Sequence, residues 1–297
     1  MAGDKQIIVG VVFPQTEIGA DVGGVRAYAE AAQELGYKHL LAYDHVLGAD
    51  PEAYAPWSGP YTSNTMFHEI LVLFGYLAGV APKLELVTGV VILPQRQTAL
   101  VAKQAAEVDV LTGGKLRLGV GIGWNWVEYD GLGTNFKNRG RRFEEQIELM
   151  RKLWLDPVIT HEGKYETVKS AGINPLPIQR PIPVWIGGSA EPALKRAAEM
   201  ADGFFPQRPL EGGWPATLAQ MKAWREAAGK SWDGYGIEAR INAGTGTPDE
   251  WRQTLAEWTA LGATHITVNT MNGGLKGPDE HIARIREVQD ALGEAAS

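Results

Sequence analysis

The pattern of apolar and polar positions along the chain repeats one unit, a short apolar strand followed by an amphipathic helix. In the clearest copy, residues 116–122 are mostly apolar and lie between glycines, as expected of a strand buried on both faces. From Arg139 to Trp154, apolar residues recur at spacings of four, three and four, while charged residues fill the opposite face. This second segment is therefore predicted as an amphipathic helix.

The same alternation continues along the chain. Strands are predicted at residues 7–14, 39–46, 84–93, 116–122, 183–186, 203–206, 237–242 and 265–270. Helices are predicted at residues 21–35, 69–80, 98–111, 139–154, 191–200, 215–228, 249–261 and 279–292. Residues 156–180 are rich in proline and glycine, have little helical periodicity, and are predicted as an insertion after the fourth helix.

Eight strands that alternate with eight helices predict one fold class. Such alternation means parallel strands joined by crossover helices, and eight of them close into a (β/α)8 TIM barrel. No interior linker divides the chain, so residues 1–297 are predicted as a single α/β domain. An open, doubly wound sheet is the structural alternative.

Composition narrows the classes of function. The net charge is −7 and the basic residues are scattered, which argues against nucleic acid or an anionic membrane as a partner. The chain has no cysteine, so disulfides and thiolate chemistry are excluded. The apolar run at residues 7–12 is too short for a signal peptide, and the run at 70–81 is shorter than the roughly 20 residues of a membrane helix. We therefore expect a soluble cytoplasmic protein that acts on a small molecule.

Common motifs of nucleotide and metal sites are incomplete. The glycines at 119 and 121 begin a dinucleotide fingerprint, but Trp124 stands where its third glycine is needed. Gly229 lies in the tail of a P-loop pattern, whose first glycine is replaced by Trp224. The sequence has neither a His-Glu-x-x-His motif nor a calcium loop, so no metal site is predicted. A metal enzyme stays an alternative because barrel strands can gather distant ligands.

Polar or glycine-rich residues follow several predicted strands, at the barrel end where catalytic groups lie. Asp44 and His45 end the second strand, and residues 187–189 follow the fifth. His45 is the predicted catalytic residue, since histidine changes charge near neutral pH and a placed acid or base contributes about 10²- to 10⁴-fold to rate. A histidine that only bonds a loop carbonyl is the alternative. Residues 187–189 turn from strand into helix, where free backbone N–H groups attract phosphate.

Several segments together carry a family resemblance. Residues 116–133, which include Leu118-Gly-Val-Gly-Ile-Gly-Trp-Asn-Trp, resemble with 139–154 the signature segment of the bacterial-luciferase-like monooxygenase and oxidoreductase superfamily. Further matches occur in the same order, at residues 88–94 with 108–114, at 161–165 before 175–177, and at 183–189. Within the superfamily, the sequence most resembles members that use the deazaflavin coenzyme F420. The resemblance implies a barrel with an insertion after its fourth helix, and a homodimer.

The resemblance also implies a cofactor site. Residues matching Gly89 and Val90 form a bulge with a cis peptide that supports the middle of the deazaflavin ring, and a plain glycine bulge is the alternative. Gly187, Gly188 and Ser189 match the residues that bind the phosphate tail, with Ser189 as an ordinary helix N-cap the alternative. Asn125 could bond the ribityl chain or a ring edge of the cofactor, and the alternative is that it only forms a turn. The resemblance also implies that Asp44 lies near the pyrimidine side of the ring and that His45 faces the substrate.

The predicted function is transfer of a hydride between F420 and an organic substrate, with His45 as the proton donor or acceptor. Trp57, Tyr61, Trp124 and Trp126 indicate a pocket for a flat or apolar substrate, although such rings also seal barrel mouths. The arginines at 139, 141 and 142 are expected on a solvated ion-pair face of a helix that also carries glutamates, with contact to a phosphate as the alternative. The alternatives are an FMN-dependent luciferase-like monooxygenase that uses O₂ and a non-catalytic flavin-binding barrel. An arginine near Trp124 would favour FMN, and that loop contains none.

Overall fold

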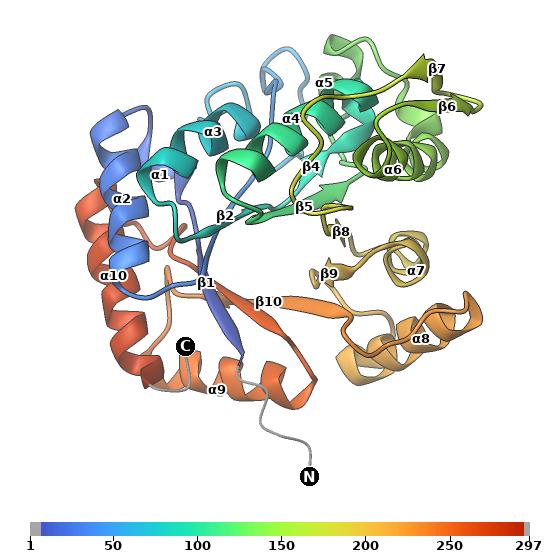
Figure 1. Cartoon of the computed structure of the whole chain (residues 1–297). Helices are drawn as coiled ribbons and strands as arrows, with labels where there is room; N and C mark the ends of the chain where they lie inside the picture. The colour runs from blue at the N-terminus through green and yellow to red at the C-terminus, as the bar shows by residue number, and fades with distance from the viewer. Residues whose placement is uncertain (1–6, 294–297) are drawn as a thin grey trace.

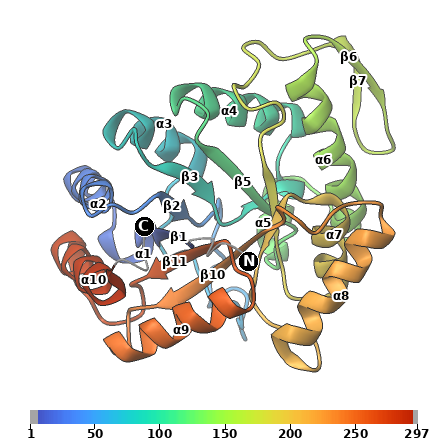
Figure 2. The same ribbon diagram turned by 60° about the horizontal axis from the view of Figure 1, so that its bottom comes forward.

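The strands pair in parallel around a closed circle in the computed structural model, which describes residues 7–293 (Figures 1 and 2). The order around the barrel is β3-β2-β1-β11-β10-β9-β8-β5, and β5 pairs with β3 to close it. The strands are β1 (Ile8–Val12), β2 (His39–Ala42), β3 (Glu85–Thr88), β4 (Val91–Ile92), β5 (Leu116–Gly121), β8 (Val184–Gly187), β9 (Gly203–Phe205), β10 (Gly236–Asn242) and β11 (His265–Asn269). Both β3 and β4 pair with β5, so they are two parts of one barrel strand. The predicted (β/α)8 barrel is confirmed, and the open sheet is wrong.

Eight long helices form the outer ring (Figure 2). They are α2 (Val22–Glu34), α3 (Ile70–Val80), α4 (Thr98–Leu111), α6 (Arg139–Leu155), α7 (Glu191–Met200), α8 (Gly213–Ala227), α9 (Pro248–Ala260) and α10 (Gly277–Leu292). Each was predicted, with ends that differ by two residues at most. Four helices of a single turn or two were missed because they are too short to show a period: α1 (Gln15–Ile18), η1 (Leu93–Gln95), α5 (Trp126–Gly131) and η2 (Phe136–Asn138). Within residues 7–293, no helix is long and apolar enough to cross a membrane.

The predicted insertion carries regular structure of its own. After α6 the chain forms an antiparallel hairpin of β6 (Ile159–Glu162) and β7 (Thr167–Ala171), which lies outside the barrel beside α6 (Figure 1). The Glu145 carboxylate on α6 accepts the backbone N–H groups of residues 164–166 and so fixes the hairpin turn to the helix. No residue of the insertion lines the cavity described below.

A layer of buried charges fills the amino-terminal end of the barrel. Glu238 of β10 accepts a hydrogen bond from His39 Nε2 at 3.0 Å and forms an ion pair with Arg117. Arg117 also pairs with Glu85, at 2.9 Å between Nη2 and Oε2. Burial alone would raise the pKa of Glu238, but Arg117 and His39 lower it by more, so the pKa lies well below its ordinary value. The charges of this layer therefore compensate one another.

A second, apolar layer covers the charges. Its members are the inward side chains Val12, Leu41, Val87, Trp185, Phe205 and Met271. Trp185 extends across the barrel over Gly236, where an added Cβ would lie 1.9 Å from the ring. Its ring also covers the Arg117 guanidinium, at 4.4 Å from Cζ to the ring centroid. The barrel is thus filled below its mouth, and glycine at 236 is required because the tryptophan occupies the space of any side chain.

The charge layer should make stability fall in acid. Burial, Arg117 and His39 lower the pKa of His265 to about 3, from 6.5. Because the folded pKa is the lower one, protonation below pH 6.5 favours the unfolded chain, and stability falls toward pH 3 by up to about 1.4 kcal/mol per pH unit. The lowered pKa of Glu238 acts in the same direction, since its stabilisation is present above 4.5 and is lost below it.

We therefore expect the melting temperature to decrease from pH 7 to pH 4, and His265→Gln to reduce the slope above pH 4.5, where Glu238 contributes little. His161→Gln, in the hairpin, is the control and should keep the wild-type slope. Thermal unfolding followed by circular dichroism measures both. An undiminished slope in His265→Gln would show that another group controls acid unfolding.

Candidate active site

A cavity of about 650 Å³ opens at the carboxyl ends of the barrel strands. This is the end of the barrel where the sequence placed the chemistry. Many of the predicted site residues line it together, although they come from separate parts of the chain: Asp44, His45, Tyr61, Gly89, Val90, Trp124, Gly187, Gly188 and Ser189. The fold therefore brings the predicted rim into one cavity of a size that suits an organic ligand.

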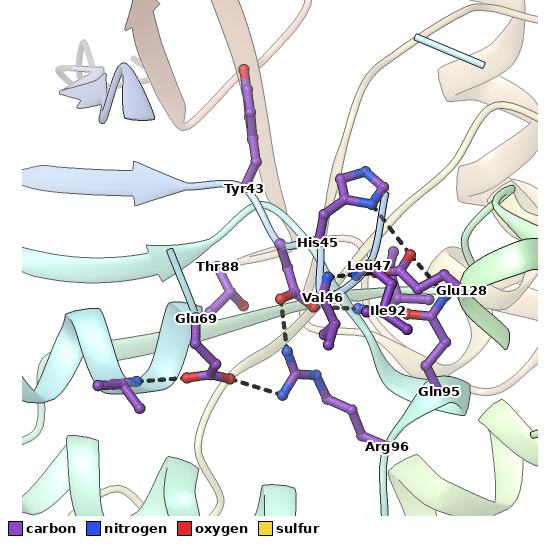
Figure 3. Close-up of polar contacts among 12 residues, drawn as sticks. Tyr43, His45, Val46, Leu47, Glu69, Thr88, Ile92, Gln95, Arg96 and Glu128 are labelled. Atoms are coloured by element: carbon purple, nitrogen blue, oxygen red, sulfur yellow. Dashed lines mark hydrogen bonds and ion pairs between the residues drawn. The ribbon is translucent and has the colours of Figure 1, made fainter. Parts of the chain in front are cut away.

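His45 lies on the cavity wall and is held by a buried glutamate. Its Nδ1 is 3.2 Å from Oε2 of Glu128, whose side chain is only 1% exposed (Figure 3). Gln95 donates to the same carboxylate oxygen at 3.0 Å. The other oxygen of Glu128 accepts the backbone N–H groups of Val46 and Leu47. One carboxylate thus fixes both the imidazole and the chain that follows it.

The hydrogen bonds of Glu128 determine which imidazole nitrogen carries a proton. Burial alone would raise the pKa of Glu128, but the hydrogen bonds from His45 and the N–H of Val46 outweigh it, and the pKa is lowered. The carboxylate is therefore ionised at neutral pH and can only accept, so Nδ1 of His45 carries the proton. In the neutral ring Nε2 is then the basic nitrogen, and it points away from Glu128 (Figure 3). This arrangement suits a proton donor or acceptor.

Aromatic rings surround the imidazole. Tyr61, Phe67 and Trp124 lie 4.9, 4.8 and 5.8 Å from His45 between ring centroids, all nearly edge-on. The His45 side chain is 12% exposed as a result. The rings form an aromatic wall around the imidazole, and Tyr61 and Trp124 also line the cavity.

Asp44 lines the cavity but uses both carboxylate oxygens within the protein. Oδ1 is 2.7 Å from Nη2 of Arg96, and Oδ2 accepts the N–H of Ile92 at 3.2 Å (Figure 3). Arg96 also pairs with Glu69 at 2.9 Å. Burial raises the pKa of Asp44 more than Arg96 and Ile92 lower it. The side chain therefore ties the end of β2 to β4, and its contact with a pyrimidine ring stays a prediction.

The peptide bond between Gly89 and Val90 is cis, as the resemblance implied. It interrupts the barrel strand between β3 and β4, and both residues line the cavity. The Val90 side chain occupies space left by two glycines on neighbouring strands. A Cβ at Gly121 or Gly187 would lie 2.8 or 2.9 Å from its methyl groups. These residues form a ledge at the base of the cavity, and the support of a ring by that ledge stays a prediction.

The amino end of α7 faces the same cavity without a side-chain cap. Its N-cap is Ala190, which has no group to accept a hydrogen bond, so the alternative of Ser189 as N-cap is wrong. Residues 187–190 all line the cavity. Pro192 has no N–H and the Ala193 N–H donates to the Ala190 carbonyl at 2.8 Å, so the N–H groups of residues 189–191 are the ones left to bind an anion.

Arg139 lies at this cavity rather than on a solvated ion-pair face, which corrects the sequence prediction. Its guanidinium stacks on Phe136 at 3.7 Å from the ring centroid, and its buried Nε has no partner among the described residues. Because β5 pairs with β8, the segments that follow these strands, with Arg139 and Gly188, lie on the same side of the mouth. Arg142 also departs from the prediction, since it binds Glu166 and backbone carbonyl groups.

Three predicted residues lie away from the main cavity. Asn125 is 2% exposed, lines a smaller pocket of about 140 Å³ beside His45, and donates to the Leu47 carbonyl at 3.3 Å. Trp57 donates to the Tyr61 carbonyl at 2.9 Å and so supports the aromatic wall from behind. Trp126 is 46% exposed at the start of α5. Contacts of these three with a cofactor or substrate stay predictions.

Two charged residues of the site were missed. Glu128 lies in the short helix α5, and the signal that marks it is one acidic residue within the aromatic segment at 124–129. Arg240 lines the cavity from β10. Its signal was the spacing of Glu238, Arg240 and Asn242, because alternate residues of a barrel strand point to the same side.

Comparisons with known proteins agree with the architecture. An uncharacterized protein of Mycobacterium tuberculosis is 35% identical over 213 residues, 68% of this chain and 72% of that protein. The FMNH(2)-dependent dimethylsulfone monooxygenase of Pseudomonas putida is 26% identical over 247 residues, 80% of this chain and 62% of that protein. A solved F420-dependent secondary alcohol dehydrogenase, in complex with an F420-acetone adduct, superposes with a TM-score of 0.75 at 17% identity over 97% of this chain and all of that one. This last likeness establishes a shared fold.

The sequence profile of the luciferase-like monooxygenases matches residues 8–241, which include the barrel from β1 through all but the last residue of β10. The matched range also contains His45, Glu128, the ledge and the α7 end. The chain belongs to the luciferase-like monooxygenase family.

Proposed function

We propose that the protein is an F420-dependent oxidoreductase that exchanges a hydride with an organic substrate, while His45 exchanges a proton with it. The observation that carries the proposal is the imidazole on the cavity wall, with Nδ1 held by ionised Glu128 and Nε2 left free, in the same cavity that Gly89 and Val90 line. When bound, a deazaflavin supplies or accepts a hydride at its ring carbon.

The residues present fit such a cofactor at both of its ends. The uncapped amino end of α7 and Arg139 offer N–H donors and a positive charge for a phosphate. The ledge offers a surface without long side chains, since Gly89, Gly121 and Gly187 surround Val90. These residues fit the phosphate of FMN as well, so the choice of F420 rests on the resemblance and on the proton-transfer group at His45.

His45 balances the hydride with a proton in either direction of reaction. A hydride and a proton together carry two electrons and two hydrogens, so a substrate that gains both undergoes a complete two-electron reduction. For substrate reduction, protonated Nε2 gives its proton to the atom that becomes negative, and for oxidation neutral Nε2 takes the proton of a hydroxyl or amine. Glu128 stabilises the positive imidazolium in both cases. The aromatic wall of Tyr61, Phe67 and Trp124 packs around the imidazole that makes this exchange.

Titration of the purified protein with F420 and with FMN tests the cofactor. We expect F420 fluorescence to be quenched at lower protein concentration than FMN fluorescence. Arg139→Met should raise the dissociation constant of F420 about 10-fold or more, because a charge-assisted hydrogen bond contributes about 1.5–3 kcal/mol. Arg141→Met is the matched control, since Arg141 is exposed on the same helix and outside the cavity.

Three results would contradict the proposal in different ways. Tighter binding of FMN with O₂-dependent turnover would make the protein a flavin monooxygenase. Binding of F420 without turnover of any substrate tested would favour a non-catalytic barrel. Equal effects of Arg139→Met and Arg141→Met would move the phosphate site elsewhere. The homodimer implied by the resemblance stays a prediction.

A further inference from the structure

Arg240 is a cation inside the cavity that has no acidic partner. It projects from β10 into the barrel mouth and is exposed there, beyond the apolar layer. No hydrogen bond or ion pair joins its guanidinium to any other residue of the described chain, and the one recorded contact of this group is with the ring of Tyr43, at 5.3 Å from Cζ to the centroid. Two residues earlier on the same strand, Glu238 is fully paired in the charge layer. An unpaired arginine on a cavity wall is a binding group for an anion.

Two further donors face the same part of the cavity. The Tyr43 hydroxyl has no hydrogen-bond partner in the described chain, and its ring points away from Arg96 in Figure 3. Burial raises the pKa of Tyr43 and Arg240 lowers it by less, so the phenol keeps its proton at neutral pH and can donate. Asn269 of β11 accepts the N–H of Met271 at 3.1 Å through Oδ1, which leaves its Nδ2 free to donate. Guanidinium, phenol and amide thus make one group of donors without an acceptor.

The charge of the cavity also favours an anion at this place. The protein carries a net charge of −7, yet the charged residues that line the cavity, besides His45, are Asp44, Arg139 and Arg240. Asp44 is neutralised by Arg96, so the cavity has an excess of positive charge. This local reversal of sign concentrates anions at the mouth.

The two arginines enter the cavity from different elements, α6 and β10. Arg139 follows β5, next to β8 and the α7 end. Arg240 is on β10, which is four strands from the ledge in either direction around the barrel, and so stands opposite Gly89 and Val90. A ring resting on the ledge would have its free face toward Arg240. The anion that Arg240 meets is therefore carried by the second reactant.

We propose that Arg240, Tyr43 and Asn269 bind the carboxylate of an organic-acid substrate, whose apolar body lies against Tyr61 and Trp124 within reach of His45. This rests on the proposed function, which it deepens by naming the substrate class. A carboxylate fits better than a phosphate, because a single guanidinium fork matches its two oxygens and, among residues 7–293, no second cation is recorded in contact with Arg240. The aromatic wall next to His45 suits a flat or unsaturated acid.

Binding of trans-cinnamate and of its neutral amide, cinnamamide, tests the subsite. Both probes have the same planar apolar body, and only cinnamate carries the charge. We expect cinnamate to bind at least about 10-fold more tightly than cinnamamide in the F420-loaded protein, measured by calorimetry. Arg240→Met should remove this preference, and Arg240→Lys should keep part of it, because lysine retains the charge and loses the fork. Tyr43→Phe should raise the dissociation constant of cinnamate about 3-fold or more and leave that of cinnamamide unchanged.

The outcomes separate the subsite from the cofactor proposal. F420 affinity within about twofold of wild type in Arg240→Met supports the assignment, whereas a loss of F420 affinity equal to the loss of cinnamate would place Arg240 at the cofactor ring and overturn it. Equal binding of acid and amide to the wild type, or an unchanged preference in both Arg240→Met and Tyr43→Phe, would also overturn it. Titrating cinnamate and cinnamamide into cofactor-free protein distinguishes the two proposals. Failure of F420 to bind refutes the proposed function, while a preference for the acid in cofactor-free protein tests Arg240 independently of the cofactor.

Discussion

Replacing His45 by asparagine is expected to lower the turnover number about 10²- to 10⁴-fold, which is the usual contribution of a placed general acid or base. Asparagine can still donate a hydrogen bond to Glu128, so the loop after β2 keeps its anchor, but it cannot exchange a proton at neutral pH. The affinity for F420 should change little, because the phosphate and ring sites proposed above do not include the imidazole. Turnover is measured through the absorbance of oxidised F420, with any substrate found by screening organic acids.

Two controls give this result its meaning. Glu128→Gln keeps the size of the side chain and an acceptor for the N–H groups of Val46 and Leu47, but loses the charge opposite His45. It should cost less than His45→Asn and change the pH profile of the turnover number. His161→Asn, in the hairpin outside the barrel, should leave turnover unchanged. Turnover within threefold of wild type in His45→Asn would assign the proton transfer to another group.

The largest expected effect on stability is that of Glu238→Ala. Removal of this carboxylate leaves Arg117 paired with Glu85 alone, which is partly exposed, and leaves His39 with only the Thr267 hydroxyl near its Nε2, so the buried positive charge is largely uncompensated. An uncompensated buried charge costs about 3–5 kcal/mol. The free energy of unfolding in urea should decrease by that amount, with a midpoint shift at an unchanged dependence on urea concentration.

Glu85→Ala is the matched control, because Glu85 pairs with the same guanidinium from a position that is 30% exposed, against 1% for Glu238. Water can replace an acceptor at a partly exposed site, so the loss should be about 1 kcal/mol or less. Equal losses in the two variants would mean that burial does not decide the cost. Full stability in Glu238→Ala would mean that Arg117 finds water inside the barrel.

The fold could be predicted because its signal is repeated. Each long helix carries a 3.6-residue period and each strand is a short apolar run next to glycine or proline, so errors at single ends leave the count of eight unchanged. The hairpin β6–β7 was missed since its strands are largely exposed and lack an apolar run. The single-turn helices α1 and α5 are too short for any period to show.

Part of the site was predictable for a topological reason. A parallel barrel brings the carboxyl ends of all its strands to one mouth, so His45, Val90 and Gly188 had to meet once the strands were placed. The partner of His45 was not predictable in this way, since Glu128 reaches it from a loop that follows a different strand. The roles of Arg139 and Arg240 were not predicted for a different reason. A sequence does not state whether an arginine next to acidic residues is paired with them.

Glu238 and Arg240 lie two residues apart on one strand and carry separate duties. Glu238 belongs to the buried charge layer that stabilises the barrel, and Arg240 belongs to the cavity wall that meets the reactant. The apolar layer of Leu41, Trp185 and Phe205 insulates one from the other. Substitution of Arg240 or Tyr43 can consequently change substrate preference without altering the charge layer. That layer continues to stabilise the fold and so offsets the loss of stability that such substitutions commonly cause.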